Sequence, residues 1–168
     1  AAAVGGILFL LYLKHDDQQA AIDRYQAALN ESLRAEEWDS ATLYLNSLCS
    51  LRPHVPQYKF QLALLSQQSG NHAAAIGLMH QLAPLTGSAG FAPARMWLVQ
   101  QTLSGRQLGL TKEQLGQQLK AAVKERPADT SAHQLLANYY VSEKQFRLAE
   151  THLREGAEYA PEMYLSLA

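Results

Sequence analysis

The sequence predicts an all-α protein, a solenoid of antiparallel helix pairs that follows an apolar N-terminal segment. The first observation is composition, since Ala, Leu and Gln are abundant among the 168 residues and all three favour helices. The second is a pattern of small and large apolar residues that returns after 34 positions. The third is an uncharged apolar run at residues 1–13. With 48% apolar residues, the composition is that of a folded chain.

Residues 1–13 contain no charge and no strongly polar side chain. As a helix they would rise about 20 Å, short of the roughly 30 Å hydrocarbon core of a bilayer. We interpret them as the C-terminal part of a transmembrane helix that continues upstream, with Tyr12 at the interface and Lys14 on the aqueous side. The alternatives are the core of a signal peptide and a plain buried helix. No Gly or Pro occurs between Ile7 and Trp38, so we predict one nearly unbroken helix from Ile7 to about Arg34.

Residues 14–168 form the predicted repeat domain. Three segments share one order: a turn, a bulky or ring residue, an alanine three positions later, a large apolar residue four positions after that, and a closing proline. The alanines are Ala41, Ala75 and Ala149, and Leu115 takes this position in a further unit. The steps from Ala41 to Ala75 and from Leu115 to Ala149 are both 34 residues. Such a step is typical of stacked helical hairpins.

An additional helix is expected ahead of each of these segments, at 25–34, 58–69, 92–103 and 131–142. The predicted units are about 22–55, 56–91, 92–129 and 130–163, and residues 164–168 would begin a further helix. Two insertions interrupt the regular spacing, one around residues 85–90 and one of about four residues within 104–110. We therefore expect an irregular central stack.

The pattern resembles the tetratricopeptide repeat over residues 22–161. The last unit carries the resemblance best, because its residues fall at the family's core positions: Leu136, Ala137, Tyr140, Phe146, Ala149 and Pro161. The resemblance implies a right-handed superhelix in which the two helices of a hairpin cross at small residues. We expect Ala63 to lie against Ala75, and Ala137 against Ala149.

No catalytic or metal-binding motif emerges from the sequence. The net charge of −1 gives no reason to expect nucleic-acid binding. The six histidines form no HExxH motif and no Cys/His cluster, so we assign them structural roles, with His133 at a core aromatic position. Cys49 is expected to pack on the second helix of the first pair. We predict no enzymatic activity, no metal and no small-molecule cofactor.

The resemblance implies a concave groove lined by the first helix of each pair. The groove positions carry over to Gln26, Asn30, Phe60, Leu64, Gln67, Met96, Gln100, Gln134, Asn138 and Val141. Side-chain amides both donate and accept hydrogen bonds, so they can hold the backbone of an extended peptide. Ordinary surface amides are the alternative. A subtype of the family grips acidic C-terminal tails with basic residues, but the matching positions are Gln26, Asn30 and Gln61 and only Asn30 fits, so such binding is not expected.

We predict a protein- or peptide-binding scaffold or assembly factor, tethered to a bacterial membrane by its N-terminal helix, with the repeats on the non-cytoplasmic, periplasmic side. We read the sequence as a fragment and expect further repeats after residue 168. One alternative is a regulatory repeat arm of a larger enzyme whose catalytic domain lies outside residues 1–168. Another is binding of a cell-envelope polysaccharide.

Overall fold

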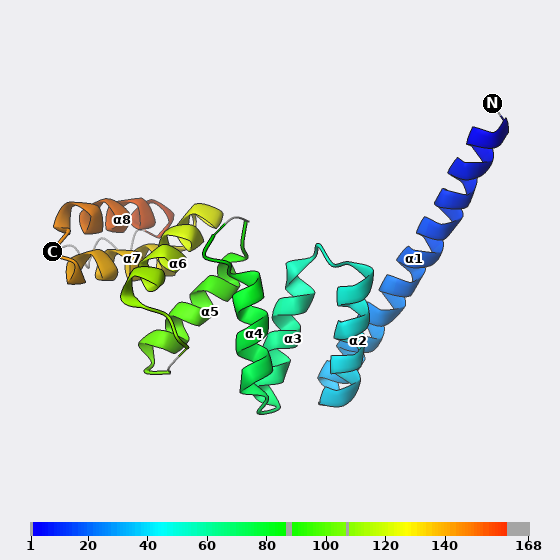
Figure 1. The fold of residues 1–168 in the computed structure, drawn as a ribbon, viewed down its shortest axis with the longest axis horizontal. Helices are drawn as coiled ribbons and strands as arrows, with labels where there is room; N and C mark the ends of the chain where they lie inside the picture. Colours follow the sequence, from blue (N-terminus) through cyan, green and yellow to red (C-terminus); the bar gives the residue numbers. More distant parts are fainter. Residues whose placement is uncertain (1, 87–88, 107, 161–168) are drawn as a thin grey trace. The chain divides into compact units, whose positions relative to one another are not determined.

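The computed structural model describes residues 2–86, 89–106 and 108–160, with side chains described from Asp17 onward. These residues contain α-helices and no strand (Figure 1). The helices are α1 (Ala2–Arg34), α2 (Trp38–Leu51), α3 (Pro56–Gln68), α4 (His72–Leu82), α5 (Ala92–Leu103), α6 (Lys112–Glu125), α7 (Thr130–Ser142) and α8 (Phe146–Tyr159). The chain divides into two compact units, residues 1–75 and 76–168, and each is described by itself.

In the first unit, α1 is a single helix of 33 residues, which confirms the prediction of an unbroken helix from Ile7 to about Arg34. Its C-terminal half packs against α2, and α2 packs against α3. The buried core of this unit consists of Ile22, Leu29, Ala41, Leu45, Leu48 and Leu65. Tyr25, Trp38 and Tyr58 cover it from the side.

No helix in the described part of the chain combines the length and the hydropathy that crossing a bilayer requires. The interpretation of residues 1–13 as part of a transmembrane helix therefore stays a prediction. The further helix expected at 164–168, and Pro161, lie outside the described residues.

The same turn closes all four helix pairs. One residue with positive φ ends the first helix in each, namely Glu36, Gly70, Gly105 and Lys144. The next N–H donates to the carbonyl five positions back, as from Asn71 to Ser66 at 2.8 Å and from Gln145 to Tyr140 at 2.9 Å. This is the Schellman arrangement, which pairs carbonyls that a helix end leaves free. Glu36 and Gly70 are 34 residues apart, so the sequence period reappears in the backbone.

Both predicted insertions are present. Three of the second helices begin two positions after the turn residue, whereas α6 begins at Lys112, seven positions after Gly105. A capping box between Thr111 and Gln114 starts α6. The loop between α4 and α5 spans residues 83–91, and Pro84 within it prevents α4 from continuing.

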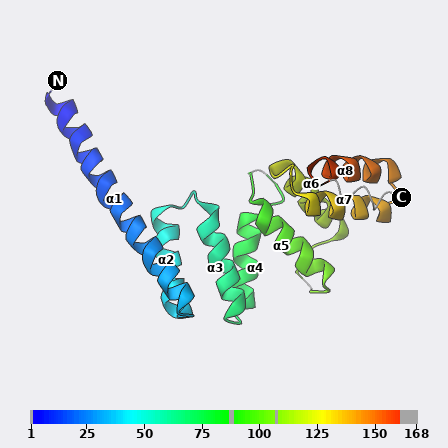
Figure 2. The same cartoon turned by 180° about the vertical axis from the view of Figure 1, so that it is seen from behind.

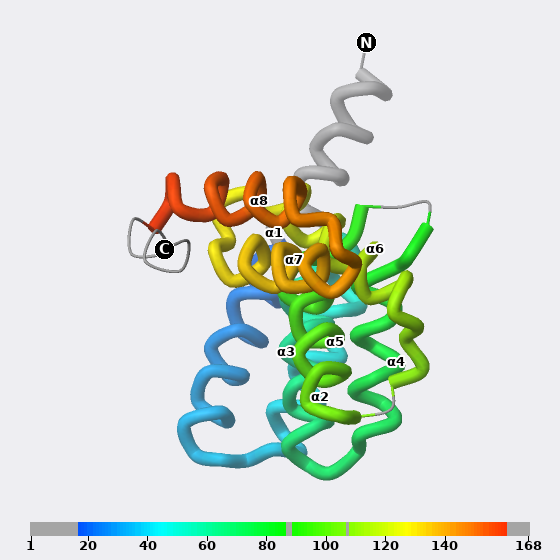
Figure 3. The backbone as a smooth tube through the Cα atoms, turned by 90° about the vertical axis from the view of Figure 1, so that its left-hand side faces the viewer, coloured from blue at the N-terminus to red at the C-terminus, as the bar shows by residue number. Residues whose placement is uncertain are grey.

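The second unit contains residues 76–82 of α4 and the helices α5 to α8. α6 packs between α5 and α7, and α8 lies side by side with α7 (Figures 2 and 3). The small residues at the predicted crossings are buried in both units, among them Ala75, Ala137 and Ala149. Phe146, which the repeat pattern places at a core position, is instead 64% exposed at the start of α8. In repeat arrays the following hairpin covers this position, and residues 161–168 lie outside the described part.

Candidate functional site

An apolar pocket opens in the second unit where α5 ends, α6 begins and α7 ends. We call it the α5–α7 pocket, and its volume is about 360 Å³. Its lining consists of Leu103, Lys112, Leu115, Leu119, Leu135, Asn138, Tyr139 and Ser142. Positions three and four apart share one face of a helix, so Leu135, Asn138 and Ser142 form one stripe on α7, and Leu115 and Leu119 face them from α6.

Gly116 allows Tyr139 to form one wall of this pocket. A Cβ built on Gly116 would lie 2.4 Å from Cζ of Tyr139, which is closer than carbon atoms approach. The missing side chain lets the ring lie directly on the backbone of α6. The half-buried phenol therefore has a fixed place beside Leu115 and Leu119.

Polar groups stand at the rim of the pocket. Lys112 forms an ion pair with Glu143, and the hydrogen bond between them, with the charge of Glu143, raises the pKa of Lys112. Asn138 is exposed, so its amide is available to hydrogen-bond a ligand backbone. The arrangement offers an apolar interior with an amide and a charged pair at the edge. Sites for ligand side chains commonly have this composition.

The predicted groove residues of the second unit are only partly brought together. Gln100, Gln134, Asn138 and Val141 are exposed, and Asn138 alone lines the pocket. Met96 is 7% exposed and belongs to the core with Val99 and Leu119, so it does not line an open groove.

The predicted groove residues of the first unit occupy varied environments. Asn30 and Leu64 are exposed, while Phe60 and Gln67 are half-buried. Gln26 is half-buried and donates a hydrogen bond from Nε2 to the hydroxyl of Tyr58, which joins α1 to α3. Gln26 is therefore engaged within the protein.

The leucines and the tyrosine of the α5–α7 pocket are not among the groove residues predicted from the sequence. Leu115 was recognised only as the residue that replaces the repeat's alanine. That replacement is the signal in the sequence for a pocket here. A leucine is larger than the alanine that lets the two helices of a pair cross closely, so it favours a wider spacing between them. Leu115 is 9% exposed and forms part of the floor.

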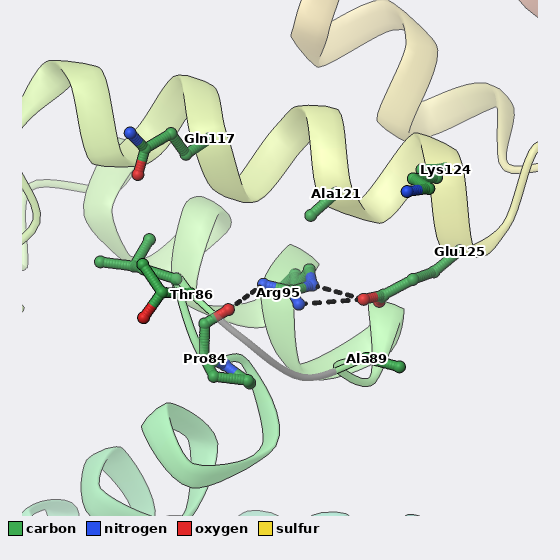
Figure 4. A pocket seen from close by; sticks show the side chains of 9 residues that line it. Pro84, Thr86, Ala89, Arg95, Gln117, Ala121, Lys124 and Glu125 are labelled. Carbon is green, nitrogen blue, oxygen red and sulfur yellow. Dashed lines mark hydrogen bonds and ion pairs between the residues drawn. The ribbon is translucent and has the colours of Figure 1, made fainter.

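A buried polar cluster lies at the other end of α6 (Figure 4). Arg95 is 3% exposed, and its guanidinium donates to Glu125 Oε1 at 2.9 Å, to the Pro84 carbonyl at 2.8 Å and to Gln118 Oε1 at 2.7 Å. Gln118 in turn donates to the Ala83 carbonyl at 2.8 Å. An adjoining cavity of about 480 Å³ opens beside this cluster. These bonds pair the carbonyls of Ala83 and Pro84, and Glu125 Oε1 also accepts from the Gly90 N–H at 2.9 Å, so the cluster has a structural role.

The thiol of Cys49 is half-buried on α2. Burial raises its pKa, and the charge of Lys59 opposes this increase. A reactive thiol needs a lowered pKa, so Cys49 fits the packing role expected from the sequence.

The hairpins with one shared turn and buried small residues at their crossings define a tetratricopeptide-like all-helical repeat protein. No family model and no curated protein matches the chain. Among solved structures the chain is similar to MamA, a tetratricopeptide-like all-helical repeat protein. The crystal structure of MamA protein has a TM-score of 0.54 and 15% identity, over 84% of this chain and 74% of that one. MamA 41-end from Desulfovibrio magneticus RS-1 has a TM-score of 0.56 and 19% identity, over 84% and 77%. At this identity the likeness shows the fold.

Proposed function

We propose that this chain is a protein-binding scaffold and that the α5–α7 pocket receives an apolar side chain of a partner peptide. The observation that carries the proposal is the pocket itself, an apolar hollow open to solvent with an amide at its rim. Its volume lies within the range of about 300–1,000 Å³ that is usual for ligand sites.

Leu103 offers a partner apolar surface to cover. Leu103 lines the pocket with a side chain that is 57% exposed. Covering apolar surface stabilises a complex by about 25 cal/mol per Å², and contiguous exposed apolar surface commonly marks an interaction site. Asn138 would then hold the peptide backbone through its amide. The neutralised pair of Lys112 and Glu143 supplies no net charge, so the pocket favours an apolar residue over an acidic tail.

We propose in addition that residues 1–13 tether the scaffold to a membrane and that the repeats lie on its non-cytoplasmic side. The support is the uncharged run and its direct continuation into the part of α1 that packs in the core through Ile22 and Leu29. A continuous helix would hold the repeats at a fixed distance from the bilayer. The regulatory arm of a larger enzyme remains the alternative, and a catalytic domain encoded in the same reading frame would favour it.

Peptide selection tests the binding proposal directly. Peptides selected from a random displayed library against the purified chain should share a large apolar residue. Leu103→Asp should raise the Kd of such peptides about tenfold or more, which is about 1.4 kcal/mol. Leu148→Asp is the matched control, because Leu148 is an exposed leucine of the same unit, 43% exposed and outside the pocket. Equal affinity of both variants would refute the pocket as the binding site.

A further inference from the structure

Three potential metal ligands meet between α7 and α8, away from the α5–α7 pocket. They are His133 on α7 and the pair His152 and Glu155, three residues apart on α8. One ligand atom from each lies within 4.8 Å of the other two. Glu155 Oε2 is 3.1 Å from His152 Nδ1 and 3.7 Å from His133 Nδ1.

The Nδ1 atom of His133 is buried and makes no hydrogen bond. The Nδ1 atom of His152 is also shielded from solvent, and it pairs with the Glu155 carboxylate 3.1 Å away. A buried polar atom without a partner costs free energy and requires an explanation. His133 is 2% exposed, so its Nδ1 is an unpaired group inside the protein and is not a surface atom.

A hydrogen bond on the opposite side of the His133 ring determines which nitrogen carries a proton. Nε2 lies 2.9 Å from the carbonyl oxygen of Pro127. A carbonyl oxygen only accepts hydrogen bonds, so Nε2 carries a proton, and in the neutral ring the lone pair lies on Nδ1. A metal-binding histidine is usually oriented in this way, with its second nitrogen donating to a carbonyl or a carboxylate. His152 is held by its neighbour, since its ring stacks on Tyr140 with centroids 5.5 Å apart.

We propose that His133, His152 and Glu155 form a binding site for one divalent transition-metal ion, with Zn²⁺ as the best-matched ion. Imidazole nitrogen with carboxylate oxygen is a ligand set that zinc accepts. Zinc bonds of about 2.0–2.1 Å in a tetrahedron place neighbouring ligand atoms about 3.3 Å apart. The separations of 3.1 and 3.7 Å lie on either side of that value. The sequence predicted structural roles for both histidines, because their spacing does not show that α7 and α8 bring them together.

A metal ion at this site would stabilise the pairing of α7 with α8. Two ligands come from α8 and one from α7, so a bound ion links the two helices and favours their folded arrangement. Three protein ligands leave the fourth position of a tetrahedron to water or to another donor. The side chain of Glu155 is 47% exposed, so an ion can reach the site from solvent on the carboxylate side.

Metal titration of the whole chain, prepared without a histidine tag and stripped with a chelator, tests the proposal. Co²⁺ should give the visible absorption of a tetrahedral complex, saturating at one ion per chain, and Zn²⁺ should displace it. Zn²⁺ at about a hundredfold excess over its Kd should raise the Tm by about 5–10 °C.

Two variants remove ligands and one serves as a control. His152→Ala and Glu155→Gln should each weaken Zn²⁺ binding at least tenfold and abolish the shift in Tm. Glu155 is half exposed, so its variant retains the fold, which circular dichroism would verify. Glu158→Gln, at an exposed position of the same helix, should bind as the unaltered chain does. Saturation at a different stoichiometry, binding only by a dimer, or undiminished binding by both variants would overturn the proposal.

Discussion

The ring of Tyr139 rests on the backbone of Gly116, with no side chain between α6 and α7 at this point. A Cβ on Gly116 would lie 2.4 Å from Cζ and 2.6 Å from the hydroxyl oxygen of Tyr139. Gly116 is buried within α6, where glycine weakens the helix by about 1 kcal/mol relative to alanine. The contact with Tyr139 therefore compensates for a residue that the helix alone would disfavour.

A double-mutant cycle at Gly116 and Tyr139 separates the low helix preference of glycine from the contact between the two residues. Gly116→Ala in the Tyr139→Ala background should stabilise the protein by about 1 kcal/mol, because only the helix preference then acts. In the unaltered background the new methyl group must displace the ring, at about 1–3 kcal/mol, so the gain disappears. Chemical denaturation gives both values, and additive effects of the two changes would disprove the contact.

The ion pair between the buried Arg95 and the half-buried Glu125 predicts a second stability effect. Arg95→Met leaves the Glu125 carboxylate, whose Oε1 accepts from Arg95, without its counter-charge. Removing one partner of a buried pair costs about 3–5 kcal/mol. The exposed pair of Arg154 and Glu150, 2.7 Å apart, is the control, and Arg154→Met should cost less than about 1 kcal/mol. Comparable losses in the two denaturation curves would count against a structural role for the Arg95 cluster.

Substitutions at Ala149 and Gln134 test the repeat register. Ala149 is 3% exposed and lies in the core of the second unit, so Ala149→Leu should destabilise by about 1–3 kcal/mol through overpacking. Gln134 is exposed on α7, and Gln134→Leu should change stability by no more than about 0.5 kcal/mol. The comparison is made by thermal melting, and equal shifts in Tm would show that the register is wrong.

The helices were predictable because their signals are local. The absence of Gly and Pro extends α1 to Arg34, and the 34-residue step locates buried residues such as Ala41 and Ala75. The extent of a helix depends on local residue types, and the burial of each alanine depends on the helix crossing that recurs in every repeat. Both can be read from a single sequence.

The details of the sites depend on pairs that are distant in sequence. Gln118 is buried because Arg95, 23 residues away, and the Ala83 carbonyl satisfy its amide, and no local pattern marks it as a core residue. Met96, expected in the groove, is buried with Val99 and Leu119, and its burial depends on how α5 packs in the second unit. His133 and His152 meet only because α7 and α8 are antiparallel. Such contacts follow from how the helices pack in three dimensions, and the repeat period of the sequence does not reveal them.

Cys49 provides a prediction about pH. Burial raises the pKa of its thiol, so the thiolate should form at a higher pH in the folded chain than in the unfolded one. Alkylation by iodoacetamide, followed by mass spectrometry across pH, should reach its half-maximal rate at a higher pH in the native protein than in concentrated urea. Coinciding profiles would show that the fold does not shield the thiol.

The last prediction concerns the proposed tether. If residues 1–13 belong to a spanning helix, the full-length protein should stay with membranes after a high-salt or carbonate wash. Salt screens the ion pairs that hold peripheral proteins, whereas burial of an apolar helix depends on area and not on charge. Removing residues 1–13, with any apolar residues before them, should release a helical protein, because Ile22 and Leu29 still anchor α1 in its core. Sedimentation with circular dichroism provides the measurement. A folded truncation that stayed in the membrane pellet would place the tether elsewhere, and a full-length protein that never sedimented with membranes would refute it.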